Sequence, residues 1–142
     1  MFVKTIFVLG ISFFTANLSY NLFQAAPAAA ASGGIYSAAQ AQRGSATFTA
    51  KCAMCHGATL DGNAPFPPLN TPEFLAKYDD KPAAVLFDKI QKTMPATAPG
   101  TLSGTDTADV LAFILSSNKY PAGTADLPSD SDSLQKVTLP KP

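Results

Sequence analysis

The feature that most constrains this chain is the pentapeptide Cys52-Ala53-Met54-Cys55-His56. Its two cysteines and its histidine are the only ones among the 142 residues. The C-x-x-C-H pattern is that of covalent haem attachment, because two thiols at this spacing on a helical turn can reach the two vinyl groups of one haem. The histidine that follows is then held beneath the iron as its proximal ligand. Cys52, Cys55 and His56 are therefore the first candidate site residues.

Three other chemistries use the same residues. Two cysteines and one histidine can bind a catalytic zinc ion, although the adjacency of Cys55 and His56 is awkward for such a site. The cysteines can also form a thioredoxin-like redox pair, which needs a βαβ setting, or a plain structural disulfide. The chain has no convincing alternating strand pattern, so haem attachment explains the pentapeptide best.

The first 31 residues have the order of a secretory signal. Lys4 supplies a positive charge, residues 5–23 are mostly apolar, and residues 25–31 offer small side chains at which a signal peptidase could cut. Polar residues in the second half of the apolar run make it a poor permanent anchor, although retention as an anchor stays open. We therefore expect residues 1–31 to be a signal peptide and the protein to be exported, most simply to a bacterial periplasm.

Removal of this segment leaves about 110 residues, which is one small domain that a cofactor with a large apolar face would help to stabilise. Ten basic and ten acidic residues balance in the full chain, and the loss of Lys4 leaves nine against ten. Binding to nucleic acid needs a clear basic excess, so no nucleic-acid partner is expected.

Helical patterns dominate the first half of the remaining sequence. Ser37 is suited to cap a helix over residues 38–52, and Gly44 within that helix suggests a close approach by another element. A loop rich in glycine and proline follows over residues 57–70, and then a short helix over residues 72–77.

The second half predicts two more helices and an irregular end. A helix over residues 83–92 should stop at Met94-Pro95. The last helix, residues 106–118, begins after Ser103 or Thr105 as its cap, and its broad apolar side should be buried. The fold class is therefore all-α, with three to five short helices.

We divide the chain into four parts on this basis. Residues 1–31 are the signal, residues 32–37 a flexible lead-in, residues 38–121 the domain and residues 122–142 an extended tail. Four apolar residues of the tail could dock on the domain, namely Leu127, Leu134, Val137 and Leu139.

Haem iron needs a sixth ligand or an open site. Met1 leaves with the signal, and Met54 lies between the two cysteines and should point away from the iron. Met94 remains as the predicted distal ligand; alternatively it fills the core and leaves a five-coordinate iron that could bind small molecules. The second nitrogen of the imidazole needs an acceptor, most simply the backbone carbonyl of Pro67 and otherwise that of Pro68.

These features resemble a class I mono-haem cytochrome c over roughly residues 38–121. Pro67-Pro68-Leu69 is similar to the loop that supports the proximal histidine, and Lys92-Thr93-Met94-Pro95 is similar to the distal-ligand segment. Gly44 and Phe48 resemble the N-terminal helix positions that cross the C-terminal helix, here Asp109-Val110-Leu111-Ala112-Phe113-Ile114. The resemblance implies a cytochrome c fold with crossed terminal helices around one covalently attached haem c, ligated by His56 and Met94.

The resemblance also implies electron transfer rather than enzymatic turnover, with no catalytic residue. Residues 116–139 are similar to cytochromes that accompany quinoprotein (PQQ-dependent) dehydrogenases, so a dehydrogenase donor and a terminal oxidase or other cytochrome as acceptor are the expected partners. The alternatives are a fixed haem subunit of a dehydrogenase complex and a five-coordinate haem sensor or peroxidase. Four lysines either contribute to a docking surface or form solvated helix faces, namely Lys77, Lys81, Lys89 and Lys92.

Overall fold

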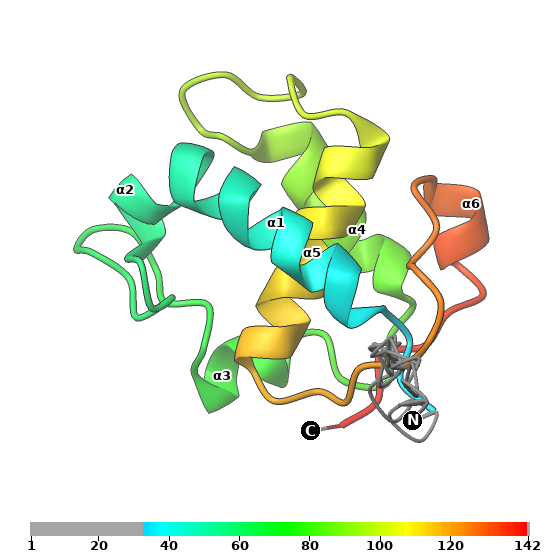
Figure 1. Ribbon diagram of the computed structural model, residues 1–142. Coiled ribbons are helices and arrows are strands. Elements are labelled where there is room, and N and C mark those ends of the chain that lie inside the picture. The colour runs from blue at the N-terminus through cyan, green and yellow to red at the C-terminus, as the bar shows by residue number, and fades with distance from the viewer. Residues whose placement is uncertain (1–32, 142) are drawn as a thin grey trace, which may run out of the picture.

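The protein is described by a computed structural model that covers residues 33–141. In this range the chain is all-α, with six helices and isolated bridges but no strand (Figure 1). The prediction of an all-α fold is therefore confirmed. The helices are α1 (Ala38–Lys51), α2 (Ala53–His56), α3 (Pro72–Leu75), α4 (Ala83–Thr93), α5 (Gly104–Ser117) and α6 (Ser131–Leu134).

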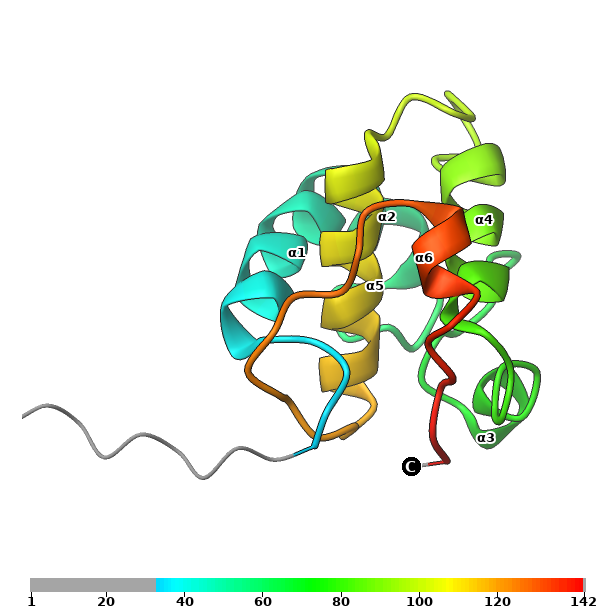
Figure 2. The same cartoon turned by 90° about the vertical axis from the view of Figure 1, so that its right-hand side faces the viewer.

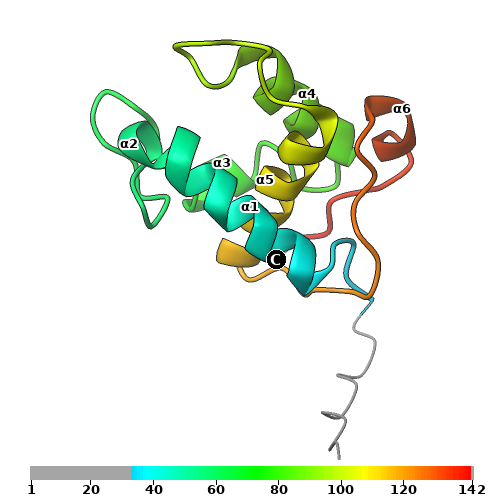
Figure 3. The same ribbon diagram turned by 45° about the horizontal axis from the view of Figure 1, so that its top comes forward.

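Helices α1 and α5 cross in direct contact (Figures 1 and 3). Gly44, near the middle of α1, is where the two backbones meet, because a Cβ atom at this position would overlap the carbonyl oxygen of Asp109. One turn later Phe48 is 1% exposed and lies against Phe113, with ring centroids 5.1 Å apart. The expectation that Gly44 marks a close approach between helices is confirmed.

Side-chain caps fix where both crossing helices begin. The hydroxyl of Ser37 accepts a hydrogen bond of 3.0 Å from the backbone N–H of Gln40, as expected for an N-cap. The hydroxyl of Ser103 accepts one of 3.0 Å from the N–H of Asp106. Of the two caps predicted for the last helix, Ser103 is correct and Thr105 lies inside the helix.

An ionic network lies beside the crossing. Arg43 on α1 donates from Nε to Asp109 Oδ2 at 2.9 Å and from Nη2 to Asp109 Oδ1 at 3.0 Å. The same Nη2 donates to Asp126 Oδ2 at 2.7 Å, and the Ser37 hydroxyl donates to Asp126 Oδ1. The hydrogen bonds from Ser37 and Arg43 lower the pKa of Asp126. The network joins α1, α5 and the segment after α5.

The C-terminal tail folds back along the domain (Figure 2). The prediction that it is extended is wrong at residues 131–134, because the Asp130 side chain accepts from the Ser133 N–H at 2.8 Å and starts the short helix α6. The predicted docking is confirmed for Leu127, Leu134 and Leu139, which are 3%, 0% and 1% exposed. Val137 is half-buried.

The described part of the lead-in also contacts the domain. Tyr36 is 2% exposed, and its hydroxyl donates to the carbonyl of Tyr120 at 2.6 Å. Residues 34–37 therefore lie against the segment that follows α5, residues 120–123, instead of projecting as a free linker. The predicted signal peptide, residues 1–31, lies outside the described residues. From residue 33 to residue 141, no helix has both the length and the hydropathy of a membrane span.

The substitution Gly44→Ala tests the crossing, because helix propensity and the close contact with α5 change the stability in opposite directions. Helix propensity alone would make Gly44→Ala more stable by about 1 kcal/mol. The overlap with the Asp109 carbonyl reverses this, and we expect a loss of about 1–3 kcal/mol in the free energy of unfolding, measured by urea titration. Gly33→Ala is the control, because a Cβ there meets no atom within 4 Å. An unchanged or higher stability for Gly44→Ala would contradict the close contact.

Candidate functional site

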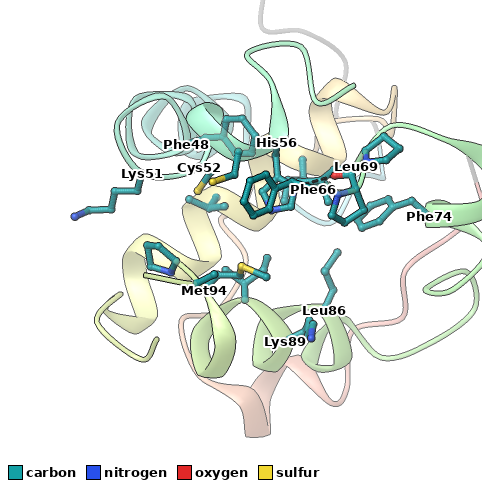
Figure 4. A pocket seen from close by; sticks show the side chains of 18 of the residues that line it. Phe48, Lys51, Cys52, His56, Phe66, Leu69, Phe74, Leu86, Lys89 and Met94 are labelled. Carbon is teal, nitrogen blue, oxygen red and sulfur yellow. Dashed lines mark hydrogen bonds between the residues drawn. The ribbon is translucent and has the colours of Figure 1, made fainter. Parts of the chain in front are cut away.

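A cavity of about 310 Å³ opens between the end of α1, the loop over residues 57–70, α3 and α4 (Figure 4). Its volume lies in the range of about 300–1,000 Å³ that is usual for cofactor and ligand pockets. Most of its wall is apolar, and Val110 and Ile114 of α5 form part of its interior surface. The cavity therefore suits a largely apolar ligand.

The wall formed by α1 and α2 carries both cysteines. Helix α1 ends at Lys51, and Cys52 occupies the break before α2 with φ −123° and ψ −36°. Cys52 and Cys55 are half-buried free thiols. Met54 between them lies at the mouth and is 81% exposed, so it points outward as the sequence suggested. Burial raises the pKa of the Cys52 thiol, and Cys55 adds to this effect.

His56 is fixed by a backbone carbonyl. Its Nδ1 lies 2.9 Å from the carbonyl oxygen of Pro67 (Figure 4). Because a carbonyl can only accept, Nδ1 carries the proton in this arrangement, and Nε2 keeps the lone pair that a metal ion requires. Of the two carbonyls proposed from the sequence, Pro67 and Pro68, the structure has the hydrogen bond at Pro67.

The loop that carries Pro67 is tied to α5 by Asn118. This side chain is 8% exposed and donates from Nδ2 to the carbonyls of Leu69 at 2.9 Å and Ile114 at 2.8 Å. Within the loop, the Leu69 N–H donates to the Leu60 carbonyl at 2.7 Å. Sequence reasoning did not assign this role to Asn118, because a polar residue at a helix end has many ordinary explanations.

Met94 lies on the wall opposite His56 (Figure 4). It is the C-cap of α4, with its N–H donating to the Ile90 carbonyl at 2.9 Å and an extended backbone that turns the chain away from the helix. Leu86 and Ile90 line the same wall at the i, i+4 spacing that continues to Met94.

Phe74 closes the cavity on the side away from Cys52 (Figure 4). Tyr78 lines it as well, with its ring centroid 5.2 Å from that of Phe74, and burial raises the pKa of its phenol. Neither residue was chosen from the sequence. Their i, i+4 aromatic spacing, in the segment between the predicted ligands, was the available signal.

Charge around the cavity has one sign. Among the described residues that line it, the charged ones are Lys51, Lys77 and Lys89. Of the other lysines noted in the sequence, Lys92 pairs with Asp88 at 2.8 Å and Lys81 donates to the Lys77 carbonyl. The cavity mouth is therefore locally positive in a chain whose net charge is zero.

The five residues predicted as a site all line this cavity: Cys52, Cys55, His56, Pro67 and Met94. An imidazole nitrogen and a thioether sulfur on opposite walls are the donor types that haem iron takes, and the two thiols beside the imidazole can add to vinyl groups. The donor set and the apolar wall fit a c-type haem. Over residues 33–141, no cluster of three or more His, Cys, Asp or Glu side chains could hold a metal ion by itself.

Comparison with known proteins gives a matching family and a similarity to a solved structure. The model of the family described as cytochrome C oxidase, cbb3-type, subunit III, matches residues 39–114. The fold is similar to a chain of the sulfane dehydrogenase SoxCD from Paracoccus pantotrophus, with a TM-score of 0.52 and 26% sequence identity. The match covers 70% of this chain and 53% of that chain, so the protein spans about half the length of this relative. No curated protein matches the sequence.

Asn118 provides a test of how the loop is held. Asn118→Ala leaves the Leu69 carbonyl without its side-chain donor, so we expect the free energy of unfolding to fall by about 1–3 kcal/mol in a urea titration. Ser116→Ala, at an exposed position of the same helix, is the matched control and should change stability by less than about 0.5 kcal/mol. Equal stabilities for the two variants would show that this hydrogen bond does not hold the loop.

Proposed function

The chain belongs to the family of cytochrome C oxidase, cbb3-type, subunit III, and from this premise we propose that it is a periplasmic one-electron carrier with His56 and Met94 as the axial ligands of one haem c. Membership of this cytochrome c family gives a haem-based electron-transfer function in broad terms, and the cytochrome c fold leaves no place for a thioredoxin-like βαβ site. The observation that carries the ligand assignment is that His56 and Met94 lie on opposite walls of one apolar cavity.

Each site residue has a separate part in this proposal. Cys52 and Cys55 form the two thioether bonds, which hold the cofactor permanently. The Pro67 carbonyl keeps the His56 ring in one tautomer and orientation. The Met94 thioether favours the reduced iron and so raises the reduction potential. The haem supplies an iron that takes up and releases one electron, and no residue of the chain acts as a catalytic group.

The partners proposed are a dehydrogenase, such as a quinoprotein, as electron donor and a terminal oxidase or other cytochrome as acceptor. Similarity to a chain of a sulfane dehydrogenase supports a donor of the dehydrogenase class. We propose the same division of the chain as before: residues 1–31 direct export to the periplasm, residues 32–37 form the lead-in, residues 38–121 form the haem domain, and residues 122–142 form the tail.

The same similarity favours a second candidate, a fixed haem subunit of a dehydrogenase complex. Size-exclusion chromatography of a gently prepared native extract distinguishes the two. A freely diffusing carrier elutes at the size of one small domain, whereas a fixed subunit elutes with a dehydrogenase at constant ratio. Haem absorbance and partner activity would be followed in the same fractions.

Met94→Ala tests the axial ligation. The exported holoprotein should give a c-type pyridine haemochrome and a weak far-red ferric band from sulfur-to-iron charge transfer. Because Met94→Ala removes the sulfur ligand, we expect this band to disappear, the reduction potential to fall and carbon monoxide to bind the ferrous protein promptly.

Met54→Ala is the matched control, because Met54 is 81% exposed and should leave the band and the potential unchanged. A wild-type protein that has haem but lacks the far-red band would support a five-coordinate sensor or peroxidase. Absence of covalent haem would reject the proposal and return Cys52 and Cys55 to a disulfide or metal-binding role.

The positive charge of the lysines at the cavity mouth should speed the reaction with negatively charged oxidants. Ferricyanide is an anion, so Lys89→Gln should slow oxidation of the ferrous protein by about twofold to fivefold at low ionic strength, measured by stopped flow. The effect should disappear in about 1 M salt, where the screening length is about 3 Å. Lys136→Gln, an exposed tail position outside the cavity lining, is the control. Equal slowing by both substitutions would mean that only the net charge matters.

A further inference from the structure

We infer that residues 124–141 of the C-terminal tail form a strap that positions α4 and thereby the proposed distal ligand Met94. The inference rests on the proposed function, because it takes Met94 as the iron ligand. The family model matches only to residue 114, so the tail lies outside the matched region. Figure 2 shows the tail running from the α1 and α5 side of the molecule to α6 beside α4.

The first anchor of the strap lies on α1. The Leu127 N–H donates to Gln40 Oε1 at 2.7 Å, and Gln40 Nε2 donates back to the Leu127 carbonyl at 3.1 Å. Gln40 is 2% exposed and Leu127 is 3% exposed, so both hydrogen bonds are shielded from water. The pair between Asp126 and Arg43 adds an ionic contact one residue earlier. This end is therefore fixed to the α1–α5 crossing.

The middle of the strap contacts the start of α5 and lies near α4. A Cβ atom at Gly104, the first residue of α5, would overlap the carbonyl oxygen of Ser129, and it would lie 3.8 Å from Gln91 Nε2 on α4. The side chain of Leu134 on α6 is fully buried. Helix α6 as a whole lies in contact with α4.

The last anchor is the N-terminus of α4. Pro82, its N-cap, provides no side-chain cap, and the tail supplies the missing acceptor, because the Ala83 N–H donates to the Val137 carbonyl at 2.7 Å. The Leu139 N–H donates to the Lys81 carbonyl at 2.9 Å, and the Asp80 N–H donates to the Leu139 carbonyl at 3.0 Å. The tail thus holds the segment that starts α4 by three backbone hydrogen bonds.

Helix α4 therefore lies between the cavity and the strap. Leu86, Ile90 and Met94 line the cavity, whereas Gln91 lies near the tail and α6 packs against the same helix. If the strap loosens, α4 loses its N-terminal acceptor and the apolar contacts of α6. A helix held less firmly opens more often, and Met94 then leaves its bound position for a larger fraction of the time.

The test uses the full-length holoprotein with the double substitution Leu134→Ala/Leu139→Ala. Imidazole added to the ferric protein competes with Met94, so its apparent affinity reports how often the methionine is displaced. We expect the affinity to rise by about tenfold in the double variant, towards the value of Met94→Ala. Leu127→Ala is the matched control, since it removes the same side chain from the α1 end of the strap, and it should change the affinity by less than about twofold.

Hydrogen exchange provides a readout that does not depend on the iron. The strap predicts that Leu134→Ala/Leu139→Ala speeds amide exchange in α4 while α1 and α5 keep their protection. If the double variant does not fold, Val137→Ala at a half-buried position of the same anchor gives the same comparison. Equal imidazole affinities for the α4-end and α1-end variants, or equal gains in exchange across α1, α4 and α5, would overturn the inference.

A wrong assignment of Met94 as the ligand would give a different experimental result from a wrong strap inference. If Met94→Ala binds imidazole no better than the wild type, Met94 is not the distal ligand and the proposed ligation is wrong. The exchange comparison then still decides whether the tail holds α4.

Discussion

The direct contact between the backbones of α1 and α5 is the constraint on which the rest of the structure depends. Gly44 has no side chain, so α1 can approach the Asp109 carbonyl, and Arg43 pairs with the Asp109 side chain beside this point. This contact fixes the direction in which α1 runs to Cys52. Helix α5 also contributes Val110 to the interior surface of the cavity. The crossing therefore fixes the position of the wall that carries the cysteines relative to this interior surface.

The two proposed axial ligands are supported in different ways. His56 is the last residue of α2, the short helix that comes directly after α1. Its imidazole is held by the carbonyl of Pro67, in a loop that Asn118 ties to α5. Met94 ends α4, which relies on the C-terminal tail for the acceptor of its first turn. The side of the site that carries the cysteines thus directly follows α1 of the central helix pair, whereas the first turn of α4 takes an acceptor from a segment outside the matched family region.

Much of the fold could be predicted because its signals are local. Ser37 and Ser103 cap helices through hydrogen bonds that span three residues, and Met94-Pro95 ends α4 by local backbone chemistry. The turn of α6 was missed because its four residues carry no apolar period, and only the Asp130 cap stabilises it locally. The Asn118 side chain donates to the carbonyl of Leu69, which is 49 residues earlier. No local sequence pattern can indicate a hydrogen bond between residues so far apart.

The sequence by itself determined the attachment motif, the helical class and the choice of candidate ligands, since each follows from residues that are neighbours in the chain or that are scarce in it. A single histidine and two cysteines leave few possible sites. The tertiary structure alone decided which carbonyl holds His56, which lysines surround the cavity, and that the tail closes over α4. These features depend on contacts between residues far apart in sequence, which exist only after the crossing of α1 and α5 has brought their elements together.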